Sequence, residues 1–133
     1  MLLTKECDYG IRIMRALSDG EKKTVQAICD MEHIPHKYSY KILKKLQKAG
    51  LVQNKLGPDG GYTRIKPLDS FSIYDIVHAI DERLFVFECL RNKKECPHNT
   101  MGHSCKVHKE LDRLQTILIN EMKAKTFGEI LGN

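Results

Sequence analysis

The sequence predicts a mainly α-helical fold with one small β-hairpin. Apolar side chains recur at spacings of three and four residues in three successive segments of the first 48 residues, which is typical of helices with one buried face. Two short strand-like runs separated by glycines follow over residues 51–66. A long helical pattern then spans about residues 105–125. With 133 residues the chain fits a single domain, and we draw no boundary inside residues 1–133.

The first two helices are predicted from their caps and their apolar spacing. Thr4 can cap a helix that runs to about Leu17, with Ile11 and Met14 on its inner face. A second, shorter helix is predicted over residues 24–31, where a threonine again precedes the apolar pattern.

The third helix is predicted over residues 36–48, and the Ala49-Gly50 pair ends it. Tyr40, Leu43 and Leu46 form its predicted inner face. Two short helices joined by a tight turn, with lysines and tyrosines on the second, indicate a helix-turn-helix. The alternative is a basic amphipathic helix whose charged face is merely solvated.

The next segment favours the first interpretation. Residues 51–56 and 62–65 are predicted strands, and residues 57–61 form the turn between them. A hairpin directly after a helix-turn-helix is the wing of a winged helix, and we predict this wing over residues 51–66. Glycines in the turn would let the backbone approach a phosphate chain closely.

Basic residues gather in the same part of the chain. The formal net charge is +5, and six lysines lie between residues 37 and 55, which is the charge pattern of a DNA-binding surface. Ser39 and Lys41 are predicted to contact base edges, and other lysines of the third helix to contact phosphates. The predicted DNA-binding residues are Lys37, Ser39, Tyr40, Lys41, Lys44, Lys45, Lys55, Gly60, Gly61 and Arg64.

Capping boxes predict two further helices. Ser72 and Asp75 open a fourth helix, and Thr126 and Glu129 open a short closing helix. Between them, the apolar residues of the pattern over about 105–125 are close to a heptad repeat, so we expect this long helix to pack on a second copy and form a homodimer. Burial of the apolar stripe within one chain is the alternative.

The segment from Cys89 to His108 has the strongest chemical signal. It holds three of the chain's five cysteines together with three histidines in a turn-rich connection. Thiolates and imidazoles suit zinc or an iron-sulfur cluster. Structural zinc sites favour short paired spacings such as C-x-x-C, which this sequence lacks, and this argues against zinc. The alternative is that these cysteines are free thiols.

Other function classes find little support. The sequence has no phosphate-binding loop, no nucleophile with a base at a plausible spacing and no recognisable pair of acidic residues, so we do not expect an enzyme. An iron-sulfur electron-transfer protein is a competing class, and the basic helix and wing argue against it. No apolar run approaches the roughly 20 residues of a membrane span, and the N-terminus lacks a signal-peptide pattern, so we expect a cytoplasmic protein.

These motifs together resemble the Rrf2 family of bacterial transcriptional regulators. The resemblance covers nearly the whole chain and implies a homodimer with crossed long helices and a winged helix-turn-helix on each side. In the IscR-like and NsrR-like branches it also implies a 2Fe-2S or 4Fe-4S cluster that senses redox state, nitric oxide or iron-sulfur supply and controls DNA binding; a CymR-like branch lacks the cluster. The segments that carry the resemblance are Asp8-Tyr9-Gly10, Lys48 to Val52, Gly57 to Tyr62, Ile73 to Asp81, the three-cysteine segment and Thr126 to Leu131.

The resemblance also implies a set of metal ligands. The matching cluster cysteines are Cys89, Cys96 and Cys105. Two residues match fourth ligands of different branches: His108, three residues after the last cysteine, and Asp8, which would reach across from the other subunit. His33 in the second helix is a third alternative, used in another branch.

One position departs from the family. Many relatives carry an arginine just before the wing glycine, where it enters the minor groove, and this chain has Leu56. Lys55 or Arg64 would then have to substitute for that contact.

Overall fold

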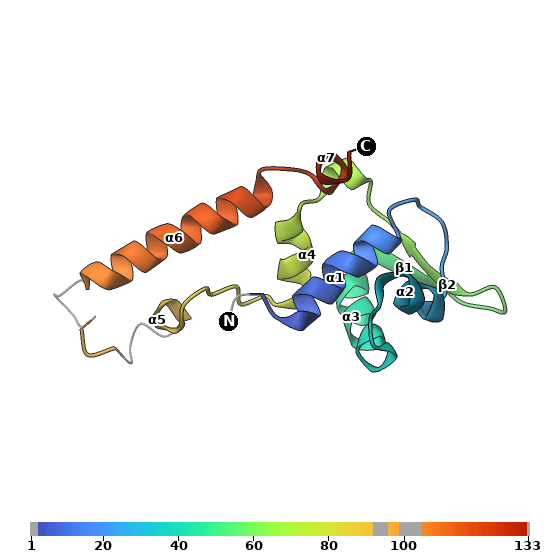
Figure 1. The fold of residues 1–133 in the computed structure, drawn as a ribbon, viewed down its shortest axis with the longest axis horizontal. Coiled ribbons are helices and arrows are strands. Elements are labelled where there is room, and N and C mark those ends of the chain that lie inside the picture. Colours follow the sequence, from blue (N-terminus) through green and yellow to red (C-terminus); the bar gives the residue numbers. More distant parts are fainter. Residues whose placement is uncertain (1–2, 92–95, 99–104, 133) are drawn as a thin grey trace.

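The computed structural model describes residues 3–91, 96–98 and 105–132. The elements in chain order are α1 (Lys5–Ala16), α2 (Val25–Glu32), α3 (His36–Lys48), β1 (Val52–Lys55), β2 (Gly61–Arg64), the 3-10 helix η1 (Leu68–Ser70), α4 (Ile73–Ile80), α5 (Glu88–Arg91), α6 (Lys106–Lys123) and α7 (Phe127–Leu131). In Figure 1, helices α1 to α4 and a hairpin form a body at one end, and a long helix extends away from it.

The predicted caps are confirmed. The hydroxyl of Thr4 accepts a hydrogen bond from the Cys7 backbone N–H at 3.3 Å, and Thr24 begins α2 in the same way. Both predicted capping boxes, at the starts of α4 and α7, are complete in both directions. These caps satisfy backbone donors that a helix start leaves free. Because they involve residues only two or three positions apart, the helix starts could be predicted from the sequence.

The core of the body lies where α1, α3 and α4 meet. Ile13, Met14, Leu43 and Leu46 are fully buried there, together with Ile76. One predicted core residue is wrong: Tyr40 is 55% exposed. The inner face of α3 is centred on Ser39, Ile42, Leu43 and Leu46, which turns Tyr40 outward.

The hairpin is the predicted wing. Strands β1 and β2 are antiparallel, with Val52 opposite Arg64 and Lys55 opposite Gly61. Lys23, just before α2, exchanges two backbone hydrogen bonds with Tyr62 at 3.0 and 2.8 Å. This bridge fixes the wing to the helix-turn-helix, and the arrangement is a winged helix.

The long helix has no buried residue along its 18 residues. Half-buried Ile119 and Met122 pack against the core, while Val107, Leu114 and Ile117 on other sides of the helix are exposed. Over the described ranges 3–91, 96–98 and 105–132, no helix is both long enough and apolar enough to span a membrane.

Candidate nucleic-acid interface and metal ligands

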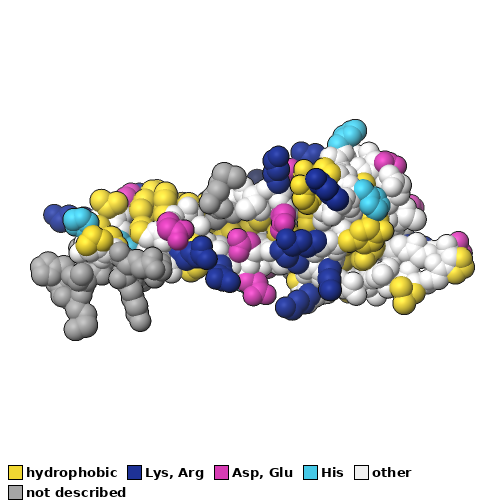
Figure 2. Space-filling view, turned by 90° about the horizontal axis from the view of Figure 1, so that it is seen from below, with side chains coloured by type: hydrophobic (Ala, Val, Ile, Leu, Met, Phe, Trp, Pro, Cys, Tyr) yellow, Lys and Arg dark blue, Asp and Glu magenta, His cyan; other side chains and the backbone are white. Residues whose placement is uncertain are grey.

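The outer face of α3 is rich in lysine. Because the inner face of the helix is apolar and buried, its lysines point away from the core. In Figure 2, which views the side on which α3 projects in Figure 1, Lys and Arg side chains gather over this part of the molecule. A shallow hollow on this face is lined by Lys41, Lys44, Lys45, Gln47 and Lys48.

Ser39 does not belong to this surface. Its side chain is fully buried, and its hydroxyl donates a hydrogen bond to the His36 carbonyl at 2.6 Å. The prediction that Ser39 contacts base edges is therefore wrong, since the residue packs on the core side of α3. Tyr40 takes the outward position instead, with its ring in edge contact with His36 at a centroid distance of 5.3 Å.

A groove separates α3 from the wing. Its lining includes Gln26 from α2, His36 and Tyr40 from α3, and Lys55 and Leu56 from the wing. The groove places one exposed lysine and one exposed tyrosine on facing walls, where a nucleic-acid backbone could pass. Leu56 at the hairpin tip is 90% exposed.

Contacts within the protein require glycine at two positions of the wing. A Cβ atom on Gly60 would lie 2.7 Å from the Lys55 carbonyl oxygen, and one on Gly61 would lie 2.6 Å from the Lys23 carbonyl oxygen. Both contacts are closer than real side chains allow. The tight turn and the bridge to the segment before α2 therefore require these glycines, independently of any phosphate contact.

Arg64 folds back onto the protein body. Its guanidinium donates to the carbonyl oxygens of Lys66 at 2.6 Å and Ser18 at 3.4 Å. This placement argues against Arg64 as the substitute for the missing wing arginine. Lys55, which is exposed beside the turn, is the remaining candidate for the minor-groove contact.

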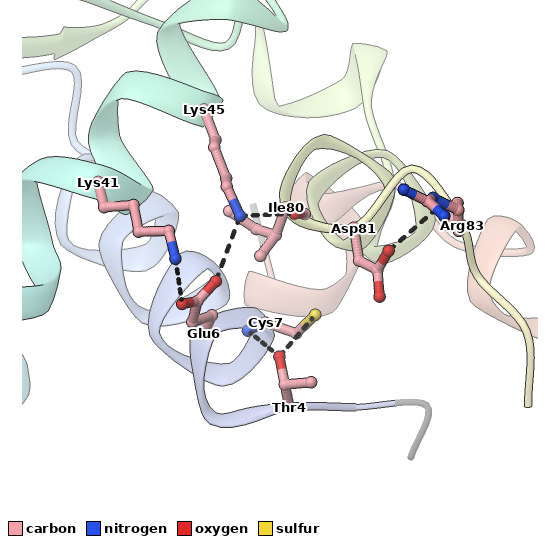
Figure 3. A network of polar contacts seen from close by, with 8 residues as sticks. All are labelled: Thr4, Glu6, Cys7, Lys41, Lys45, Ile80, Asp81 and Arg83. Carbon is pink, nitrogen blue, oxygen red and sulfur yellow. Dashed lines mark hydrogen bonds and ion pairs between the residues drawn. The ribbon is translucent and has the colours of Figure 1, made fainter.

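Two lysines of α3 are held by one carboxylate (Figure 3). Lys41 Nζ lies 3.1 Å from Glu6 Oε1, and Lys45 Nζ lies 3.3 Å from Glu6 Oε2. Lys45 also donates to the carbonyl of Ile80 at the end of α4, at 3.1 Å. The hydrogen bond from Lys41, reinforced by Lys45, lowers the pKa of the Glu6 carboxyl below its usual value of 4.5. Glu6 is therefore ionised at neutral pH.

No sequence pattern predicted this contact between Glu6 and the two lysines. Glu6 lies 35 residues from Lys41 and 39 from Lys45, and its only local signal is that of an acidic residue in a first helical turn. Lys37, in contrast, lies over the ring of Tyr38 at 4.9 Å, and Lys44 and Lys48 are exposed.

The three predicted cluster cysteines lie at separate positions along the chain, two of them at helices and one outside any helix or strand. Cys89 lies on α5, Cys96 follows the residues 92–95, and Cys105 is the N-cap of α6; all three are half-buried. Much of the predicted cluster segment, residues 92–95 and 99–104, lies outside the described residues. Within the described part of the chain, no group of three or more Cys, His, Asp or Glu side chains gathers closely enough to hold a metal ion.

The start of α6 nevertheless has features of a ligand site. The Cys105 sulfur accepts a hydrogen bond from the His108 backbone N–H at 3.5 Å, at a helix end where backbone donors favour negative charge. The Nδ1 atom of His108 is buried and, among the described residues, has no hydrogen-bond partner. A buried imidazole nitrogen without a partner is uncommon, and coordination of a metal would satisfy it.

The other two candidates for a fourth ligand are surface residues. Asp8 is exposed on α1 and forms an ion pair with Arg12, with 3.1 Å between Oδ2 and Nε. His33 is exposed at the C-terminus of α2, where it has a left-handed backbone with φ of 54°. Over residues 3–91, 96–98 and 105–132 of one chain, neither of them joins the cysteines in a group that could hold a metal ion.

Comparison with known proteins agrees with this architecture. A family model named Rrf2, described as iron-dependent transcriptional regulator, matches residues 3–133. Protein rrf2 of Nitratidesulfovibrio vulgaris is 30% identical over 100 residues, covering 73% of this chain and 67% of that protein.

Two solved structures share the fold. IscR of T. potens superposes with a TM-score of 0.76 at 17% identity, covering 99% of this chain and 87% of that one. CymR, the global cysteine regulator of B. subtilis, has a TM-score of 0.76 at 18% identity, covering 98% of this chain and 95% of that one. With a winged helix, a basic helix α3 and a family match from residue 3 to residue 133, this chain belongs to the Rrf2 family of DNA-binding transcriptional regulators, which are not enzymes.

Proposed function

We propose that this protein is a single-domain, homodimeric regulator whose affinity for its operator is controlled by an iron-sulfur cluster, either 2Fe-2S or 4Fe-4S. The cluster ligands would be Cys89, Cys96 and Cys105 with one further residue. The observation that carries the proposal is the buried Nδ1 of His108, which lies one helical turn after Cys105 and has no hydrogen-bond partner in the part of the chain that the structure describes. It favours His108 as the fourth ligand, with Asp8 of the partner subunit as the alternative and His33 third.

The homodimer is proposed from the surface of α6. Val107, Leu114 and Ile117 are 66%, 41% and 45% exposed, which is unusual for large apolar residues at helical spacing. A second copy of α6 would cover them. A dimer would also allow a ligand from the partner to complete a site that the described residues of one chain do not assemble.

Sensing would follow from the mixed ligand set. A bound cluster would supply an iron whose single nitrogen or oxygen ligand exchanges more readily than a thiolate. Cys105 and His108 both lie at the start of α6, so their engagement would fix where the long helix begins. The signal would be redox state, nitric oxide or iron-sulfur supply.

The test of the cluster is anaerobic purification followed by an absorption spectrum and counts of iron and sulfide. We expect a coloured protein, and a Cys105→Ala variant that is colourless. Cys29→Ala is the matched control, because Cys29 is buried in α2 and outside the predicted ligand set. A colourless, iron-free wild type that resists reconstitution would contradict the proposal.

The test of control is a comparison of cluster-loaded and cluster-free protein on one operator, taken first from the promoter of its own gene. The two states should differ in affinity by about 1–3 kcal/mol, the usual size of an allosteric coupling. Equal affinities would show that the cluster does not control DNA binding.

A second candidate is a thiol-responsive or metabolite-responsive regulator without a cluster. It is favoured by one observation, namely that the three cysteines do not converge within the described residues. In that case the protein would lack iron, and mild oxidation of the cysteines or a bound metabolite would alter operator affinity instead.

A further inference from the structure

We propose that Glu6 competes with DNA phosphate for Lys41 and Lys45, so that the start of α1 limits the DNA affinity of the recognition helix α3. DNA binding itself is a property of the family, whereas the internal competitor is inferred from the contacts of Glu6 in this structure. The starting point is that one carboxylate neutralises two cations on the surface that has to meet a polyanion.

The geometry supports competition. The two carboxylate oxygens of Glu6 are each engaged by a different lysine, Oε1 by Lys41 and Oε2 by Lys45 (Figure 3). Both lysines come from successive turns of α3, so the carboxylate lies along the helix much as a phosphate would. Phosphate contacts from lysine are the main source of nonspecific DNA affinity, so a lysine that is already paired contributes less.

The contact is also exposed enough to break. The Lys41 side chain is 64% exposed, and the side chains of Glu6 and Lys45 are 32% and 35% exposed. Ion pairs of this exposure are weak and strongly screened by salt, so a DNA backbone can displace the carboxylate. Lys41 is the more exposed of the two and has no other hydrogen-bond partner among the described residues, whereas Lys45 also holds the carbonyl of Ile80. We therefore expect Lys41 to transfer to DNA more readily.

A link to the cysteine segment is the second part of the inference, and it rests on the proposed function. Glu6 is two residues from Asp8 in the first turns of α1, and Lys45 binds the end of α4, from which the chain continues to Cys89. This link belongs to the alternative in which Asp8, rather than His108, is the fourth ligand: engagement of Asp8 by a cluster would shift the start of α1 and with it the carboxylate of Glu6. The competitor would then be stronger in one cofactor state than in the other.

The test is Glu6→Gln, measured by fluorescence anisotropy on the operator at several salt concentrations. We expect affinity to rise about three- to tenfold, because two weak ion pairs no longer have to be broken. The slope of log K against log salt should become steeper by up to about two, since up to two more lysines then release counterions on binding.

Glu110→Gln is the matched control. Glu110 is also an exposed glutamate paired with a basic residue, Arg113 on α6, so the variant loses the same charge and the same kind of ion pair away from α3. A decisive second comparison introduces Glu6→Gln into a Lys41→Ala, Lys45→Ala background, where the gain should vanish. The idea is overturned if Glu6→Gln gains no more than Glu110→Gln, or if its gain persists without the two lysines. Thermal unfolding of each variant checks that the fold is retained.

Measuring the operator affinity of every variant with and without the cluster separates the competition by Glu6 from the control by the cluster. If Glu6→Gln gains affinity equally in both preparations and the wild type shows no difference between them, the competition stands and cluster control fails. If the operator affinity of the wild type differs between the two preparations and Glu6→Gln gains no more affinity than Glu110→Gln, cluster control stands and the competition fails. If Glu6→Gln removes the difference between preparations, both parts hold.

Discussion

At the residue scale, the basic face of α3 divides into two kinds of lysine. Lys41 and Lys45 are paired with Glu6, while Lys44 and Lys48 are exposed on the same helix. Formal charge counts all four alike, but only a free ammonium group adds fully to the field that meets DNA.

Lys44→Ala should weaken binding to all DNA sequences alike, because a lysine on phosphate carries no base information. The slope of log K against log salt should become shallower by about one unit. Lys109→Ala on α6 is the control, since it removes an exposed lysine far from α3. An unchanged slope for Lys44→Ala would remove this residue from the interface.

Leu56 is the second residue-scale prediction. Its side chain is 90% exposed at the wing tip, at the position where the resemblance places a minor-groove arginine. Leu56→Arg should increase affinity severalfold for operators with a narrow, A·T-rich minor groove beside the half-site, because such grooves attract cations. Leu56→Ala is the control, and an equal gain on G·C-rich and A·T-rich duplexes would show that only the added charge matters.

At the scale of elements, the wing depends on its bridge to the segment before α2. The hydrogen bonds between Lys23 and Tyr62 add a short third partner to a two-stranded hairpin that would be marginal alone. Close backbone approach at Gly61 makes this bridge possible.

Gly61→Ala should therefore destabilise the protein by about 1–3 kcal/mol, the usual cost of overpacking. The added methyl group would lie 2.6 Å from the Lys23 carbonyl oxygen, and backbone at that position cannot move without breaking the bridge. Urea unfolding measures the loss, with Asn54→Ala on the exposed side of β1 as the control. Stability equal to the control would show that the bridge adapts.

At the scale of the whole molecule, α6 sets the shape. It extends away from the body in Figure 1. The structure describes every residue of α6, and none of them is buried. Only part of its apolar surface packs on α4 and the core, which leaves Leu114 and Ile117 exposed.

Leu114→Glu should raise the dissociation constant of the proposed dimer by at least about tenfold, since it would bury an unpaired charge. Sedimentation or light scattering measures the oligomeric state, and operator binding should fall with it. Thr116→Glu is the control: Thr116 is exposed two residues along the helix, on nearly the opposite side. A wild-type protein that is monomeric at micromolar concentration would contradict the dimer.

The sequence by itself determined the order and approximate limits of the longer helices and the hairpin, whereas the short η1 and α5 were not predicted. The helices begin at Thr4, Thr24, Ser72 and Thr126 as predicted, and the wing lies between residues 51 and 66. Caps and turns form hydrogen bonds across about three residues, so their signals are local and can be recognised in the chain. The ligand set stays a prediction from the resemblance.

Only the tertiary structure decided which side chains remain available for function. It placed Ser39 in the core, turned Tyr40 outward, folded Arg64 onto the body and paired Lys41 and Lys45 with Glu6. The helical phase of α3 is fixed by the helices packed against it, and Glu6 is brought to α3 by the packing of α1. Contacts between residues 35 or more positions apart leave no pattern in a single sequence, because they depend on how the helices pack rather than on their neighbours in the chain.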